Sequence, residues 1–228
     1  TALINGRFAG HPWGSGTQCS FVNHEPEHPV VKMLGGDFQW KDEIYQYNDY
    51  DPKAVRVLYS LDMVKTNPKR PYLVPVCWVR DYGTGRLFYT NLGHNEATWK
   101  DAKFHDHLLA GIKWATKLLD GPAAPNPDVQ QAEHNRAVVA FAAALAGKDA
   151  NNYLAKAKSN AAWLADVSTA ASNATKAQDA VNGVRDPDAK KTKPEELEAQ
   201  KAAAKTKRAE LQTKFDDAKK ALLAALEK

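Results

Sequence analysis

An abrupt change of composition divides this chain of 228 residues and constrains its fold more than any single motif. Residues 1–121 carry 17 of the 21 aromatic residues, both cysteines and six of the seven histidines, with only seven alanines. Residues 122–228 carry 30 alanines and four aromatics. The two segments meet at a stretch rich in glycine and proline, residues 121–127, which is typical of a connection between domains. We therefore expect a domain over 1–121 and an alanine-rich helical region over 122–228.

Charge, hydropathy and cysteine content exclude several classes of protein. The 31 basic and 27 acidic residues give a net charge of +4, dispersed along the chain, whereas a nucleic-acid binder concentrates its basic residues. No apolar run approaches the roughly 18 residues of a membrane-spanning helix. Cys19 and Cys77 lie far apart with no Cys-x-x-Cys motif, which argues against a disulfide scaffold or a thiolate zinc site. We expect neither a nucleic-acid partner nor a membrane span.

The first segment has strand patterns followed by a helix pattern. Runs of β-branched and aromatic residues predict strands over 17–23, 54–61, 72–80 and 86–91. Two glycines between the last two strands predict a hairpin, and Pro75 indicates an edge or a bulge.

Apolar residues at spacings of three and four then predict a helix from Thr98 to about residue 119, with Thr98 and Asp101 resembling a capping box. The predicted apolar face comprises Phe104, Leu108, Ile112, Ala115 and Leu119. Four strands with one helix give thin cover for an α/β sheet. We therefore expect the chain to begin inside a domain whose first half is missing.

Two loops contain residues suited to binding a sugar. The loop over 6–14 combines three glycines with Arg7, His11 and Trp13, and a flat aromatic ring beside an imidazole suits a polar ligand with an apolar face. The alternative is a glycine-rich turn anchored by a buried tryptophan. In the second loop, Glu43 and Tyr45 follow Asp42. Such carboxylates bind hydroxyl groups or metals or transfer protons, unless they are simply solvated.

His94 and Glu96 lie between the last predicted strand and the helix. Open α/β sheets bind ligands at such a position, and a carboxylate close to a histidine can orient it as a base. The alternative is a histidine that caps the following helix. His11 and His94 are the candidate metal ligands, but no residue spacing in the chain forms a complete metal motif.

Several motifs together resemble the ThuA-like, or trehalose-utilisation, domain family over essentially all of residues 1–119. They are Gly-Arg-Phe-x-Gly-His-Pro-Trp at 6–13, Glu-His-Pro at 27–29, Lys-Asp-Glu-Ile-Tyr-Gln-Tyr at 41–47, and Trp-Val-Arg-Asp-Tyr-Gly-Thr-Gly-Arg-Leu-Phe-Tyr-Thr-Asn-Leu-Gly-His at 78–94, continuing through Trp99 to Ile-Lys-Trp-Ala at 112–115. The matched segment resembles the C-terminal half of such a domain.

The resemblance implies an α/β fold with a partial flavodoxin-like sheet of the class I glutamine amidotransferase type. In amidotransferases of that fold a His-x-Glu pair lies between a late strand and the last helix, where His94 and Glu96 stand here. ThuA-like proteins are thought to lack the nucleophilic cysteine and to act in the metabolism of trehalose or keto-disaccharides. The resemblance thus implies no amidotransferase activity, and it favours a periplasmic or extracellular location over a cytoplasmic one.

We expect one sugar site that draws on all these segments. The predicted catalytic residues are His94, Glu43 and Glu96, with His94 as the proton-transfer group or metal ligand and Glu43 as a base or hydroxyl acceptor. The predicted substrate-binding residues are His11, Trp13, Arg7, Tyr45 and Trp99, with Trp13 as the stacking surface. A divalent metal is a possible cofactor. The alternatives are a non-catalytic carbohydrate-binding or interaction module and a metal-dependent hydrolase.

The second segment is predicted to be helical throughout. Asn126, Pro127 and Asp128 form a good helix start, and the expected helices cover about 127–146, 149–182 and 194–227. Alanine-rich helices with a thin apolar stripe approach closely but bury little surface. We therefore expect a helical hairpin or a loose three-helix arrangement. It is either a spacer or a self-association arm, or else a marginally ordered tail.

Overall fold

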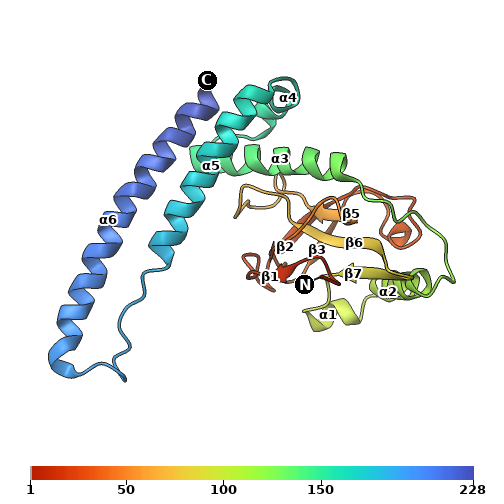
Figure 1. Cartoon of the computed structure of the whole chain (residues 1–228), viewed down its shortest axis with the longest axis horizontal. Coiled ribbons are helices and arrows are strands. Elements are labelled where there is room, and N and C mark those ends of the chain that lie inside the picture. The colour runs from red at the N-terminus through yellow and green to blue at the C-terminus, as the bar shows by residue number, and fades with distance from the viewer. Residues whose placement is uncertain (1) are drawn as a thin grey trace. The chain divides into compact units, whose positions relative to one another are not determined.

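The computed structural model describes residues 2–228, which divide into two compact units at Ala137 and Val138 (Figure 1). This division lies inside one helix, α3 (Pro127–Ala146), whereas the composition changes at residue 121. We call the residues up to Ala137 the first unit and those from Val138 onward the second unit. None of the helices in the described part of the chain is long and apolar enough to cross a membrane.

The first unit is built on a five-stranded sheet with the strand order β3-β2-β5-β6-β7. Its strands are β2 (Gln18–Asn23), β3 (Phe38–Lys41), β5 (Arg56–Leu61), β6 (Pro75–Tyr82) and β7 (Gly85–Thr90). Every neighbouring pair is antiparallel. The mixed α/β class is therefore confirmed, but the expected flavodoxin-like arrangement is not what residues 2–228 form, because that sheet type is mostly parallel.

The predicted hairpin is present, with Tyr82 opposite Gly85 in the β6–β7 pair and Gly83 at a φ of +59° in its turn. Pro75 is the first residue of β6, where the lost backbone donor matters least. The register between β5 and β6 shifts twice beside it. β3 was not predicted, since its four residues alternate between half-buried and exposed and show no apolar run.

The loop over 6–14 lies antiparallel to the segment over 42–48. The short strands β1 (Arg7–Phe8) and β4 (Tyr47–Asn48) pair with each other, and Trp13 forms a bridge with Ile44. Between them, Ala9 donates to the Gln46 carbonyl at 2.9 Å. This pairing joins two segments that lie far apart in the sequence, and it places both candidate loops side by side.

The helix predicted from Thr98 is divided in two, α1 (Glu96–Trp99) and α2 (Ala102–Ala115). Asp101, rather than Thr98, is the N-cap of α2, and its side chain accepts from the backbone of Lys103 and Phe104. The Thr98 hydroxyl instead donates to the Asp42 carboxylate, so it is not available as a cap.

The predicted apolar face of α2 was also wrong in part. The buried residues are Phe104, His107, Ala110, Gly111 and Trp114. Ile112 is 59% exposed, because the side of the helix that packs on β7 is the one that carries Gly111. A Cβ on Gly111 would lie 2.2 Å from the Phe88 ring of β7, so the helix approaches the sheet through a residue without a side chain.

The second unit is helical beyond the end of α3. Its helices are α4 (Asn151–Ser159), α5 (Ala161–Asn182) and α6 (Pro194–Glu227). Asn160 divides the helix predicted over 149–182, since its side chain accepts from the backbone of Trp163 and starts α5. Figure 1 shows α5 and α6 side by side as a hairpin, and Lys228 pairs with Asp166 at 3.0 Å near its open end.

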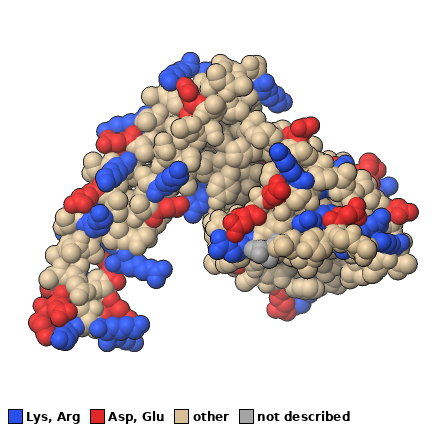
Figure 2. Space-filling model, viewed as in Figure 1, with Lys and Arg blue, Asp and Glu red and all other residues tan. Residues whose placement is uncertain are grey.

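Charges of both signs are intermingled on the face of the molecule that Figure 2 shows. Many acidic and basic residues pair within one helix turn, such as Lys201 with Glu198 at 2.8 Å in α6. This distribution agrees with the small net charge of +4 and is that of a solvated helix surface.

Candidate functional site

Three predicted site residues from three separate segments meet in the first unit. One carboxylate oxygen of Glu43 lies 3.5 Å from Nδ1 of His11, and the other lies 3.6 Å from Nδ1 of His94. The Glu43 side chain is 14% exposed, while those of His11 and His94 are 56% and 44% exposed. A carboxylate at the base of the site is therefore flanked by two imidazoles that face solvent. Both distances exceed those of good hydrogen bonds, so the three side chains lie close together without being tightly bonded to one another.

Asp42 holds the His94 loop against the Glu43 segment. Its buried carboxylate accepts from the backbone of Gly93 at 2.7 Å and of Asn95 at 2.8 Å, and from the Thr98 hydroxyl at 2.9 Å. It also accepts from the Glu43 backbone at 3.0 Å. Hydrogen bonds to an ionised carboxylate are stronger than neutral ones. One side chain thus sets the position of His94 relative to Glu43.

Asn95 completes the connection between the loops. Its side-chain amide donates to the carbonyls of Ser15 and Lys41, both at 2.9 Å. Gly93, at a φ of +122°, occupies a backbone region that side chains disfavour. A Cβ at Gly93 would also lie 3.3 Å from the Phe104 ring. Asp42 and Asn95 together therefore hold the loop before α1 in this conformation.

Aromatic rings lie beside the cluster. The Phe8 ring is stacked on that of His11 at a centroid distance of 6.1 Å and meets Tyr45 edge to face at 5.3 Å. Burial, with the nearby carboxylates of Glu43 and Asp42 as further causes, raises the pKa of Tyr45, so its hydroxyl is protonated at neutral pH. Trp99 is exposed and donates its indole N–H to the Gly93 carbonyl at 2.7 Å. Phe8 and Trp99 are the exposed flat surfaces here.

Two predicted substrate-binding residues, Trp13 and Arg7, do not face the cluster of His11, Glu43 and His94. Trp13 is only 1% exposed and donates its indole N–H to the Asn67 carbonyl. The expectation of a stacking surface at Trp13 is therefore corrected: the ring anchors the glycine-rich loop, as the alternative interpretation proposed. Arg7 is exposed and pairs with Asp49 at 2.9 Å, and no contact joins it to the histidine cluster.

Glu96 does not orient His94. Its carboxylate is 84% exposed and pairs with Lys100 at 2.6 Å, one helix turn further on. The carboxylate that faces His94 is Glu43, from a segment about fifty residues earlier. The pairing predicted within His-x-Glu is therefore corrected, because residue 96 already belongs to α1 and points along that helix.

A comparison with protein-family models matches residues 1–115 to the family described as ThuA, trehalose utilisation. The match covers half of the chain. The chain belongs to the ThuA family. No curated protein and no solved structure matches it. All three members of the histidine and glutamate cluster lie within the ThuA match, as do Asp42, Phe8 and Trp99.

Neither cysteine of this ThuA protein has the environment of a nucleophile. Cys19 and Cys77 are both buried. Burial, with the charge of Asp42 adding to it, raises the pKa of the Cys19 thiol to about 12. Burial likewise holds the pKa of Cys77 well above its usual range. Both side chains are therefore neutral thiols, and a neutral thiol is a poor nucleophile.

No group of three or more His, Cys, Asp and Glu side chains among residues 2–228 is arranged to hold a metal ion. The side chains of His11, Glu43 and His94 are themselves groups that form hydrogen bonds and exchange protons. The metal-dependent hydrolase, which would use His11, Glu43 and His94, stays an untested alternative.

The sequence interpretation missed two contributors, Phe8 and the structural role of Asp42. Phe8 lies within the motif at 6–13, and an aromatic residue in a glycine-rich loop can indicate a ligand-binding surface. Nothing local in the sequence distinguishes Asp42, which is fully buried, from its half-buried neighbour Glu43.

Proposed function

We propose that this ThuA-family protein binds a carbohydrate related to trehalose at the cluster of His11, Glu43 and His94, and promotes proton transfer at one of its hydroxyl groups. The observation that carries the proposal is the position of Glu43 between two solvent-facing imidazoles, within 3.6 Å of both. Carboxylates and imidazoles are the groups that most often bind sugar hydroxyls and exchange protons with them.

Each group in the cluster has a separate part in this proposal. Glu43 accepts a hydrogen bond from a sugar hydroxyl and acts as the base. His94 takes this proton from Glu43 and passes it to solvent, and the position of its ring depends on the loop that Asp42 holds. Phe8 and Trp99 provide apolar surface for the C–H face of the ring. Amidotransferase chemistry is not part of the proposal, because neither cysteine is a thiolate.

Calorimetry with trehalose and with a keto-disaccharide, followed by a turnover assay on both, tests the proposal. Glu43→Gln keeps the shape of the side chain and removes its charge, and His94→Ala removes the imidazole. We expect each to weaken binding or turnover at least about tenfold, which corresponds to about 1.4 kcal/mol. Glu27→Gln is the matched control, since Glu27 is an exposed carboxylate that pairs with Lys32 away from the site. If both site variants behave like Glu27→Gln, the assignment is wrong.

A non-catalytic carbohydrate-binding module is the second candidate. The observation in its favour is that the Phe8 and Trp99 rings are exposed, because an exposed aromatic ring can pack on a sugar without any proton transfer. Binding of trehalose without turnover of any disaccharide, with loss of that binding in Glu43→Gln, would support this candidate.

A further inference from the structure

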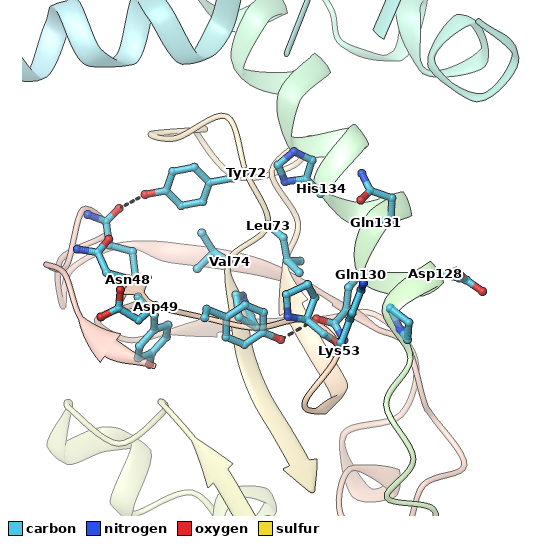
Figure 3. Close-up of a pocket in the computed structure, with 16 residues that line it drawn as sticks. Asn48, Asp49, Lys53, Tyr72, Leu73, Val74, Asp128, Gln130, Gln131 and His134 are labelled. Carbon is cyan, nitrogen blue, oxygen red and sulfur yellow. Dashed lines mark hydrogen bonds between the residues drawn. The ribbon is translucent and has the colours of Figure 1, made fainter. Parts of the chain in front are cut away.

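A second cavity of the first unit is separate from the histidine cluster. It has a volume of about 610 Å³ and lies between the segment over 46–53, the segment over 72–75 and the start of α3 (Figure 3). His11, Glu43 and His94 do not line it. Binding sites for small molecules are typically about 300 to 1,000 Å³, so this cavity is large enough for one.

Several polar groups in the cavity wall are already bonded within the protein. The Tyr50 hydroxyl donates to Gln130 at 2.7 Å, and the amide of Gln130 donates to the carbonyls of Pro52 and Val55. The Tyr72 hydroxyl donates to the side-chain oxygen of Gln46 at 3.0 Å, which Figure 3 marks with a dashed line. Gln130 is 2% exposed. These bonds hold the wall in place without a ligand, which reduces the entropic cost of binding.

The interior of the cavity is mainly apolar. Leu73, Val74 and Pro75 line one side. The tyrosines contribute the apolar surface of their rings, since their hydroxyls are bonded to other groups of the protein. Tyr47, for example, bonds through its hydroxyl to Tyr89 at 2.8 Å. A ligand must therefore offer an apolar face to this part of the cavity.

The remaining lining groups are polar but do not favour an ion. Asn48, Gln131 and His134 supply hydrogen-bonding groups, and Lys53 and Asp128 carry opposite charges. Burial lowers the pKa of His134, so its imidazole is neutral at pH 7 and both donates and accepts. Asp49 also lines the cavity, but its carboxylate pairs with Arg7 at 2.9 Å. With Asp49 paired in this way and Lys53 opposite in charge to Asp128, the lining matches a neutral molecule.

We infer that this cavity binds an uncharged cyclic compound, with a ring face against Leu73 and hydroxyl or amide groups directed to Asn48 and His134. The inference does not depend on the proposed sugar site. It assigns the protein a second ligand of a different chemistry, a flat ring with a polar edge.

NMR titration of the isotope-labelled full chain tests this inference. The probe is 4-hydroxybenzamide, a neutral ring with hydroxyl and amide groups, and the matched probe is 4-hydroxybenzoate, which has the same ring and a negative charge. We expect amide shifts over 46–53, 72–74 and 128–134, and an affinity for the benzoate at least about fivefold lower. No shifts at these residues up to about 10 mM, or equal affinity for both probes, would overturn the inference.

A variant whose larger side chain fills the cavity provides a second test. Leu73→Trp should weaken 4-hydroxybenzamide binding at least about tenfold, while Leu118→Ala, at an exposed position away from the cavity, should leave it unchanged. If Leu73→Trp does not fold, Gln131→Trp at an exposed place on the rim serves the same purpose. Equal binding in a folded filled variant contradicts the inference. Glu43→Gln should weaken the binding of trehalose but leave that of 4-hydroxybenzamide unchanged. The two proposed sites are therefore tested independently of each other.

Discussion

Asp42 is the residue on which the geometry of the candidate site depends most. It is buried, and four donors from residues 43, 93, 95 and 98 converge on its carboxylate. Glu43, its neighbour, faces the two histidines. The two adjacent carboxylates therefore have different surroundings: Asp42 holds the loops in position, and Glu43 faces the two histidines. Both carboxylates can be read from the sequence. Only the structure shows that Asp42 is buried while Glu43 is partly exposed.

Asp42→Asn should destabilise the first unit by about 2 to 4 kcal/mol, because an amide places a donor against donors and leaves them unsatisfied in the interior. Urea unfolding measures this change. Trehalose affinity should fall as well, since the position of His94 is lost. Glu96→Gln is the control, because its exposed pair with Lys100 contributes little. A loss of stability in Asp42→Asn no larger than that in Glu96→Gln would contradict this role.

At the scale of elements, the close approach of α2 to β7 depends on Gly111. The pattern of apolar residues along α2 predicted a helix but assigned part of its buried face wrongly. Residues 104, 107, 110, 111 and 114 form the face that packs, and it includes a histidine and a glycine. Hydrophobic periodicity does not detect these residue types. The position of Phe88 on β7 decides the face, and that is a tertiary contact.

Gly111→Ala should destabilise the protein by about 1 to 3 kcal/mol, although the same change in an exposed helix stabilises by about 1 kcal/mol. The added Cβ would lie 2.2 Å from the Phe88 ring, so the helix or the ring must move. Gly36→Ala is the matched control, since nothing lies within 4 Å of its Cβ position. Thermal unfolding of both variants measures the cost of the clash with Phe88. A stabilised Gly111→Ala protein would contradict this packing.

In the second unit, Asn160 separates α4 from α5 by capping the second helix. Asn160→Ala removes the bond to the Trp163 backbone and should cost about 1 kcal/mol. Hydrogen exchange at residues 161–164 should increase. Asn173→Ala, at an exposed position within α5, should instead leave stability unchanged or raise it slightly, because alanine favours a helix interior. Equal exchange in the two variants would show that the cap contributes nothing.

At the scale of the whole molecule, the two units should respond differently to pH. All seven histidines lie in the first unit. Burial lowers the pKa of His24 and of His107 to about 4 and also lowers those of His28 and His134. Such a group binds its proton more readily in the unfolded chain, where its pKa is about 6.5.

The free energy of unfolding of the first unit should therefore be highest above pH 6.5 and fall as the pH decreases from about 6.5 to 4. Each buried histidine contributes a slope of up to about 1.4 kcal/mol per pH unit. The second unit has no histidine and should not share this slope. Hydrogen exchange as a function of pH resolves both units in one sample. His107→Gln, which keeps a donor for the Val30 carbonyl, should reduce the slope. An unchanged slope would rule out His107 as a source.

The sequence by itself determined the division into an aromatic part and an alanine-rich part, the hairpin, the principal helices, and the motifs of the ThuA family. These depend on local patterns and on composition. The tertiary structure decided which residues meet: Glu43 faces His11 and His94, Trp13 is buried, and Glu96 points to solvent. The physical reason is that these contacts arise from pairing between segments far apart in the chain, 6–14 with 42–48 and the His94 loop with Asp42. No local pattern encodes such pairing.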